Sequence, residues 1–467
     1  MTACAIEGGT AGAATTAEPP EPEESGEPEG PVGAVPAERE EFAGAAPAAS
    51  DEPAGALPAA RVEFAGAKGR PGAVPAASDE PAGAAATPWG RAPRDPAAFT
   101  LTADGAYGTR LTAAPGPPGE QRAWYPERWT LDGPEPYAVP LPLNQPEEPD
   151  AQVAPLADGR VLIRRRVADR QMFSLLYPTG PGTGELALGA VECPEMTLLP
   201  PSPDGGSVYA LSAGEHSSLV WLVAGGAFGP ELVAEIPGHC SGGVWLDGAG
   251  RILALDRRLV GGGPVKAVAV DLERNGEVTP LLQITPESND RLVLADADSG
   301  LLLLRSDAPG HDRLGWGVLG SCLPVRFPEC LRPADAAVTP FAVQPGQMLM
   351  PESCAVALRI DGAAGTWVGV WRPQGRRLHQ FAAPEGWSAG AGYWTRDGVL
   401  RLPYANAATP CAVALLDAPA DEEPQPATDR ADGDASGREP SAAITPPTVC
   451  RPVPLGQAPL RRPAPPD

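Results

Sequence analysis

Acidic residues recur at one position of a weak repeat in this chain, and carboxylates gathered on one face of a protein attract cations. Six short segments spaced 42 to 56 residues apart carry the pattern, and the middle residue is glutamate in five of them. These middle residues are Glu147, Glu192, His239, Glu287, Glu329 and Glu385. On a shared face they would form an acidic rim for a cation, an amine or an arginine-rich partner segment, and Asp95 could extend it. The alternative is that each glutamate caps or solvates its own loop.

The segment Gly238–Gly243 places a histidine, a cysteine and a serine side by side, which suggests nucleophilic catalysis. Adjacent residues of an extended chain point in opposite directions, so His239 is badly placed to serve Cys240 as a base. A serine hydrolase would need the motif G-x-S-x-G on a strand-to-helix elbow, and we expect none in this chain. We therefore expect no catalytic residue.

Metal and cofactor sites are not indicated either. The four histidines show none of the close spacings of a metal site, and the eight cysteines include no C-x-x-C pair. The glycine-rich stretches 180–184 and 261–266 lack the lysine beside serine or threonine of a phosphate loop, so we interpret them as loops between strands. We expect no bound metal and no cofactor.

Composition narrows the classes of partner. The chain of 467 residues has a formal net charge of −24, which disfavours nucleic acid and anionic membrane surfaces. The N-terminal sequence has no basic segment followed by an apolar one, and no stretch is long and apolar enough for a membrane helix. Scattered cysteines fit reduced thiols. These features predict a cytoplasmic protein that binds another protein or a small cationic ligand.

Segment composition predicts four regions. Residues 1–96 are rich in alanine, proline and glutamate and poor in aromatic residues, so we expect a disordered acidic arm. Residues 97–417 alternate short apolar runs with turn signals and should fold. A second acidic tract, 418–447, is expected to be a disordered insertion, and 448–467 should provide a closing strand and a tail.

Within the folding region, a polar tight-turn signal precedes a short apolar run seven times, at steps of 43 to 54 residues. The signals are Asp104-Gly105, Asp158-Gly159, Asp204-Gly205, Asp247-Gly248, Asp298-Ser299-Gly300, Gln344-Pro345-Gly346 and Asp397-Gly398. A period of this length built from short strands resembles the β-propeller superfamily in architecture only. One blade cannot bury its apolar faces alone, so blades stack until the ring closes.

The resemblance implies an all-β fold of seven blades with six as the alternative. In the seven-bladed version Tyr137–Leu143 is the outer strand of blade one, and Val453–Leu460 completes blade seven. In the six-bladed version Tyr137–Leu143 pairs with residues 388–417. The run Gln347–Met350 is predicted to be the second strand of blade six, and 160–177 to be two strands rather than a helix.

The sequence repeats its strand units but shows no cluster of residues that could form a nucleophile, a base or a metal site. This pattern favours a non-catalytic scaffold that binds a protein or a ligand. Two alternatives stay open. One is a propeller enzyme, a hydrolase or lyase whose polar residues converge in the central channel. The other is a regulatory subunit of an enzyme complex.

Overall fold

The structure is a computed structural model that describes residues 98–114, 122–346 and 350–419. The chain divides into two units, 1–420 and 421–467, and every described residue belongs to the first. The predicted arm over 1–96, nearly all of the predicted insertion over 418–447, and the predicted strand Val453–Leu460 lie outside the described residues. So does Asp95.

The described residues form short antiparallel sheets, with two 3₁₀ turns and no α-helix among them. The first sheet contains β1 (Thr100–Leu101), β2 (Tyr107–Ala113), β3 (Trp124–Thr130) and β4 (Tyr137–Pro140). The second contains β5 (Gln152–Pro155), β6 (Val161–Val167), β7 (Arg170–Pro178) and β8 (Thr183–Glu192). The third contains β9 (Thr197–Leu198), β10 (Val208–Ala213), β11 (Ser217–Ala224) and β12 (Glu231–Pro237).

The remaining strands continue the same order. A larger sheet contains β13 (His239–Trp245), β14 (Ile252–Arg258), β15 (Lys266–Asp271), β16 (Glu277–Pro280), β17 (Asp290–Ala295), β18 (Leu301–Ser306) and β19 (Arg313–Val318). After the 3₁₀ turn η1 (Glu329–Leu331) come β20 (Ala336–Val343), β21 (Val356–Gly362), β22 (Gly365–Trp371) and β23 (His379–Ala382). The turn η2 (Pro351–Ser353) precedes β21, and the last sheet contains β24 (Tyr393–Trp394), β25 (Val399–Tyr404) and β26 (Ala412–Asp417).

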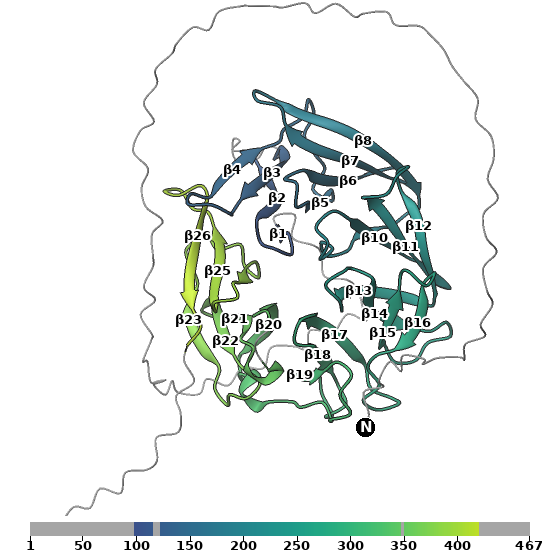
Figure 1. Ribbon diagram of the computed structural model, residues 1–467, viewed down its shortest axis with the longest axis vertical. Helices are drawn as coiled ribbons and strands as arrows, with labels where there is room; N and C mark the ends of the chain where they lie inside the picture. Colours follow the sequence, from purple (N-terminus) through teal and green to yellow (C-terminus); the bar gives the residue numbers. More distant parts are fainter. Residues whose placement is uncertain (1–97, 115–121, 347–349, 420–467) are drawn as a thin grey trace, which may run out of the picture. The chain divides into compact units, whose positions relative to one another are not determined.

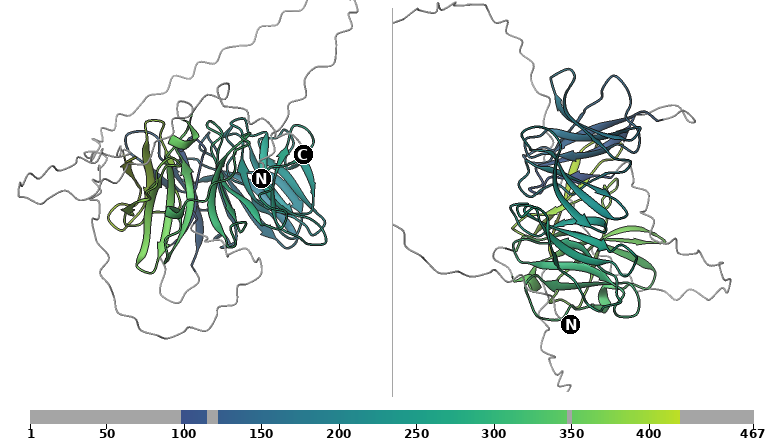
Figure 2. Two further views of the ribbon diagram at one scale, coloured as in Figure 1. Left: turned by 90° about the horizontal axis from the view of Figure 1, so that it is seen from below. Right: turned by 90° about the vertical axis from the view of Figure 1, so that its right-hand side faces the viewer.

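These sheets follow one another around a ring, with β1, β5, β13, β17 and β20 towards its centre (Figure 1), and Figure 2 shows the same ring from two sides. Each of six buried hydrophobic clusters joins two neighbouring groups of strands. The last sheet meets the first where Arg401 donates a hydrogen bond to the carbonyl of Leu131 at 3.3 Å. This arrangement confirms the β-propeller architecture that the turn repeat predicted.

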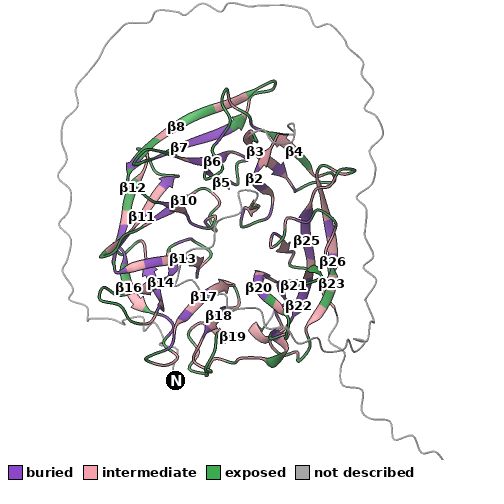
Figure 3. Ribbon diagram, turned by 180° about the vertical axis from the view of Figure 1, so that it is seen from behind, coloured by how far each residue is buried: buried purple, intermediate pink, exposed green. Residues whose placement is uncertain are grey.

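The apolar runs are continuous because each sheet is covered on both faces. Successive side chains of a strand point to opposite faces. In β18, Leu301 and Leu303 join one hydrophobic cluster, while Leu302 and Leu304 join the next one around the ring. Exposed residues concentrate on outer strands such as β8 (Figure 3).

Six of the seven turn signals lie in the hairpins between the first and second strands, and Gln344-Pro345-Gly346 lies at the start of the longer connection from β20 to β21. The Asp158 carboxylate accepts a hydrogen bond from the backbone N–H of Arg160 at 2.9 Å, and Gly159 adopts a φ of +81°. The Asp104 carboxylate accepts from the N–H of Ala106 in the same way, beside Gly105 at φ +71°. Aspartate bonds its own turn and glycine tolerates the left-handed backbone, which explains why this pair recurs.

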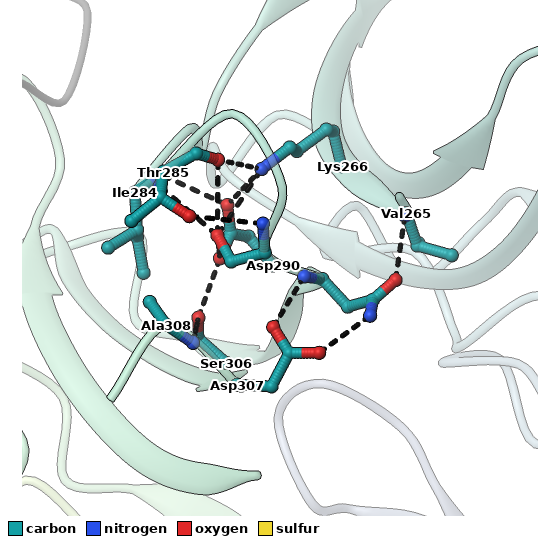
Figure 4. A network of polar contacts seen from close by, with 10 residues as sticks. Val265, Lys266, Ile284, Thr285, Asp290, Ser306, Asp307 and Ala308 are labelled. Atoms are coloured by element: carbon teal, nitrogen blue, oxygen red, sulfur yellow. Dashed lines mark hydrogen bonds and ion pairs between the residues drawn. The ribbon is translucent and has the colours of Figure 1, made fainter. Parts of the chain in front are cut away.

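A polar network joins the β13–β16 group of strands to β17 and β18 (Figure 4). Lys266 pairs with Asp290 at 2.7 Å, and Asp290 is fully buried. The same carboxylate accepts hydrogen bonds from the N–H of Ile284 and the hydroxyls of Ser288 and Ser306. These bonds fix the start of β17 against β15, where the two strands form a single parallel pair.

Three expectations can be compared directly with the observed strands. The second strand of the sixth group is β21 and not the predicted run Gln347–Met350, of which only Met350 is described and is exposed. Pro351 opens a 3₁₀ turn there, so the chain turns before the strand begins. The stretch 160–177 does form two strands, β6 and β7, as predicted. The start of the predicted outer strand, β4, pairs with β3 and not with strands of 388–417.

Candidate functional site

The six residues of the predicted acidic rim all lie near the junctions between successive groups of strands. Glu192 ends β8 and His239 begins β13, whereas Glu329 begins η1. Glu147, Glu287 and Glu385 lie in the connections that precede β5, β17 and β24. His239 is therefore a strand residue.

Three of the five glutamates are paired with arginines of their own sheets. Glu147 is 8% exposed, and both of its carboxylate oxygens lie 2.7 Å from the guanidinium of Arg165. Glu192 and Glu329 are exposed and form ion pairs of 2.6 and 2.7 Å with Arg170 and Arg313. These ion pairs weaken the case for a cation-binding rim at the three positions. A carboxylate that already pairs with an arginine of its own sheet attracts an outside cation only weakly.

The other two glutamates differ from these three. Glu287 and Glu385 are exposed, and neither forms an ion pair with another described residue. That the five carboxylates act together as an acidic rim stays a prediction.

The His239, Cys240 and Ser241 group shows no catalytic arrangement. The Nδ1 atom of His239 lies 3.2 Å from the carbonyl oxygen of Gly214. Burial raises the pKa of the Cys240 thiol to about 11, so the thiol stays protonated at neutral pH. Among the residues that the structure describes, no group of three or more histidine, cysteine, aspartate or glutamate side chains could hold a metal ion.

One serine spacing was missed in the sequence. Gly386–Gly390 matches G-x-S-x-G, the spacing of a hydrolase nucleophile. In the structure Ser388 lies in the connection between β23 and β24, where its N–H donates to the carbonyl of Pro403 at 3.2 Å. No helix follows it, so the strand-to-helix elbow that exposes such a serine is not formed.

A cavity of about 360 Å³ is lined by residues of β9, β13 and β17, together with one residue each of β14 and β18. Its polar side chains are Asp256 from β14, Arg291 from β17 and Arg305 from β18. Its apolar wall consists of Leu198, Pro200, Val244, Leu292 and Val293. A concave, largely apolar pocket with a few converging polar groups is the usual form of a ligand site.

Asp256 is the buried acid of this cavity. It is 8% exposed, and its Oδ1 atom accepts a hydrogen bond from the N–H of Leu292 at 3.1 Å. Burial raises the pKa of Asp256 to about 7 and outweighs the lowering by that hydrogen bond and by the charge of Arg291. The carboxyl group therefore changes its charge near neutral pH, unlike an ordinary surface aspartate.

The two arginines have different surroundings. Arg305 donates to Asp312 at 2.7 Å and to the carbonyl of Val338 in β20 at 2.6 Å, which fixes its guanidinium group. Arg291 is the charged neighbour that acts on Asp256. Its position follows from that of Asp290, the preceding residue, which the network of Figure 4 fixes at the start of β17.

Two strands that border the cavity are irregular. The pairing of β13 with β14 shifts between Ser241 and Val244, where Gly242 and Gly243 have φ of +77° and +140°. A Cβ atom on Gly242 would lie 3.3 Å from Oδ2 of Asp256, and one on Gly243 would lie 2.7 Å from a methyl carbon of Leu199. Strand β17 also shifts register, between Leu292 and Leu294. Bulges of this kind often lie beside binding sites, where they re-aim side chains.

The sequence analysis missed this site, although one signal was available. Asp256 directly follows the apolar run Ile252–Leu255, so it places a charge within a strand that is otherwise buried. No spacing rule connects it with Arg291 and Arg305, which are 35 and 49 residues further along the chain.

Comparisons with known proteins give structural matches at low identity. The chain is similar to the acylaminoacyl peptidase of Pyrococcus horikoshii, with 12% identity and a TM-score of 0.41 over 67% of this chain and 49% of that one. It is also similar to the β-propeller domain of the Trilobed protease from Pyrococcus furiosus, with 9% identity and a TM-score of 0.44 over 67% and 90%. It is similar as well to TolB from Acinetobacter baumannii, with 11% identity and a TM-score of 0.36 over 67% of this chain and 80% of that one.

The chain thus spans about half the length of the peptidase. No family model and no curated protein matches it. The protein contains a β-propeller. That statement follows from its ring of sheets, and the matches carry no argument about its activity.

Proposed function

We propose that this protein is a non-catalytic, ligand-binding β-propeller with seven blades, the fifth formed by β17–β19 and the seventh by β24–β26. Three observations support this count: six hydrophobic clusters join successive blades, Arg401 bridges the last blade to the first, and the side chain of Tyr393 packs against the turn at Gly105. We further propose a cytoplasmic location, supported by the six described cysteines, all of which are free.

The cavity at Asp256 carries the proposal. It has a buried carboxyl group, two arginines and an apolar wall contributed by three consecutive blades. Its volume of about 360 Å³ lies within the roughly 300–1,000 Å³ typical of small-molecule sites. We propose a small molecule as the occupant rather than a protein segment.

The enzyme alternative has one supporting observation, which is the pKa of Asp256 near 7. A general acid or base works best with such a value. However, Asp256 is the only residue lining the cavity that titrates near neutral pH, since the arginines stay protonated. We propose binding in preference to hydrolase or lyase chemistry because no nucleophile or second acid lines the cavity.

A protein partner is the second candidate, favoured by the exposure of Glu287 and Glu385. A basic segment that contacts these two carboxylates would make the propeller a scaffold or a regulatory subunit.

A thermal-shift screen of small molecules against the full chain tests the proposal. The matched control is Val293→Trp, which fills the cavity and changes no charged group. We expect several compounds to raise the melting temperature of the wild type and to lose that effect in the variant. If no compound stabilises the wild type, or if every stabilising compound acts equally on Val293→Trp, the cavity is not a binding site.

A further inference from the structure

Three large apolar side chains are exposed on the outer strands β8 and β12, which belong to neighbouring sheets of the ring (Figure 1). Phe228, in the hairpin between β11 and β12, is 96% exposed, the highest value among the large apolar residues that the structure describes. Leu186 on β8 and Leu232 on β12 are half-exposed. We call these three residues the outer patch. Single exposed apolar residues are ordinary, whereas several gathered in one place mark an interaction surface.

Strand pairing places the two leucines on the two sides of one junction. Leu186 pairs with Leu175, which is buried in the hydrophobic cluster that joins the second and third sheets. Leu232 pairs with Trp221, which packs against the same cluster from the third sheet. Cross-strand partners share a face of their sheet. Leu186 therefore points towards the third sheet, and Leu232 points towards the second.

The hairpin that carries Phe228 connects the two sides. A Cβ atom on Gly189 of β8 would lie 2.9 Å from Cδ of Pro230, and one on Gly229 would lie 2.6 Å from the carbonyl oxygen of Leu188. The two glycines permit this approach, because a side chain at either position would collide with the other segment. The hairpin therefore lies against β8, which keeps Phe228, the residue before Gly229, at the junction.

Two glutamates of β12 supply the charge beside the outer patch. Glu231 and Glu235 are exposed, and neither forms an ion pair with another residue that the structure describes. Glu235 pairs with Leu219, two residues before the partner of Leu232, so it shares the face that carries Leu232. The glutamates of β8 are instead bonded to arginines of their own sheet. The carboxylates left to meet a partner thus lie on the β12 side.

We propose that the outer patch binds a segment of another protein in which large apolar side chains stand next to lysine or arginine. The apolar side chains of that segment cover the patch, and its basic side chains pair with Glu231 and Glu235. A second copy of this chain is a poorer occupant, because two molecules with a formal net charge of −24 repel each other. The patch shares no residue with the cavity at Asp256, so this inference goes beyond the proposed small-molecule site.

Fluorescence anisotropy of the full chain with three labelled peptides of equal length tests the inference. One peptide combines leucine with lysine, the second combines leucine with glutamate, and the third combines serine with lysine. The leucine–lysine peptide should bind at least about tenfold more tightly than either of the others, because it alone supplies both apolar and basic side chains.

Variants assign this binding to the outer patch. Phe228→Ser should weaken the leucine–lysine peptide at least about tenfold and leave the melting temperature unchanged, since this side chain is almost fully exposed. The matched control Leu323→Ser, at an exposed leucine in the connection after β19, should leave the affinity unchanged. Glu235→Gln should weaken binding about threefold, whereas Glu215→Gln, in the hairpin between β10 and β11, should not.

Four results overturn the inference. The leucine–lysine peptide fails to bind, the serine–lysine peptide binds equally well, or Phe228→Ser and Leu323→Ser weaken binding alike. The fourth is a wild-type dimer in sedimentation velocity that Phe228→Ser dissociates, which assigns the patch to a second copy. None of these results bears on the cavity, because the thermal-shift screen tests that site separately through Val293→Trp.

Discussion

Asp256 combines a structural cost with the proposed role in binding. Its native pKa is near 7, well above the ordinary aspartate value of 3.8. Between these two values the folded state holds the proton more tightly than the unfolded state. The contribution of Asp256 to stability is therefore present at low pH and is lost as the pH rises towards and through 7.

The first prediction follows from this sign. Asp256→Asn should match the wild type in stability near pH 4 and exceed it at pH 8, by about 1.4 kcal/mol for each unit by which the native pKa of Asp256 exceeds its ordinary value. Urea unfolding of both proteins across this pH range measures the difference. A variant that is equally destabilised at every pH would show that Asp256 serves as an ionised structural residue.

The ion pair between Lys266 and Asp290 allows a second prediction about single residues. Replacing Lys266 by methionine leaves the fully buried Asp290 without its cation, and such losses cost about 3–5 kcal/mol. The double variant Lys266→Met, Asp290→Asn should recover part of this loss in urea unfolding, because no buried charge remains unpaired. Equal losses in the single and double variants would show that the hydrogen bonds of Asp290, not its charge, hold β17 against β15.

At the scale of elements, the connections that contain the glutamates differ in what they stabilise. Glu147→Gln should lower the free energy of unfolding by about 1–3 kcal/mol, because it breaks a buried, two-bonded pair with Arg165. Glu287→Gln and Glu385→Gln, at exposed positions, should change it by less than about 0.5 kcal/mol. Chemical unfolding of the three single variants provides the comparison.

The acidic-rim hypothesis predicts a different pattern for the same connections. If the five glutamates repel one another across a shared face, Glu287→Gln and Glu385→Gln should raise stability and weaken the binding of a basic peptide. Unchanged peptide affinity in the double variant would leave each glutamate with a local role only.

The strands and turns were more predictable from sequence than the site. Asp158-Gly159 and its equivalents encode their hairpins locally, through a side chain that bonds its own turn and a residue that tolerates positive φ. The cavity depends instead on bulges in β13 and β17 that bring Asp256 next to Arg291. Such contacts arise from how neighbouring blades pack, and no local spacing encodes them. The run Gln347–Met350 was predicted wrongly because its apolar residues outweighed Pro351 in the pattern.

For the whole molecule, the ring explains why each blade needs its neighbours. Second strands such as β18, with its four consecutive buried leucines, place side chains in the clusters on both faces. No helix among the described residues is long and apolar enough to cross a membrane.

The predicted N-terminal arm gives a test at this scale. Its apolar content is mostly alanine, which gains little from burial compared with roughly 1–2 kcal/mol of backbone entropy per ordered residue. Deleting residues 1–90 should leave the melting temperature nearly unchanged, as measured by calorimetry. A large drop would show that the arm packs on the propeller.

The central claim is that ligands bind between the blades at Asp256. Amide hydrogen exchange of the full chain, with and without the most stabilising compound of the screen, tests it most directly. The account predicts slower exchange confined to β13, β14 and β17, with the amide of Leu292 among the most protected. Protection limited to the connections around Glu287 and Glu385, with no change in these three strands, would contradict it.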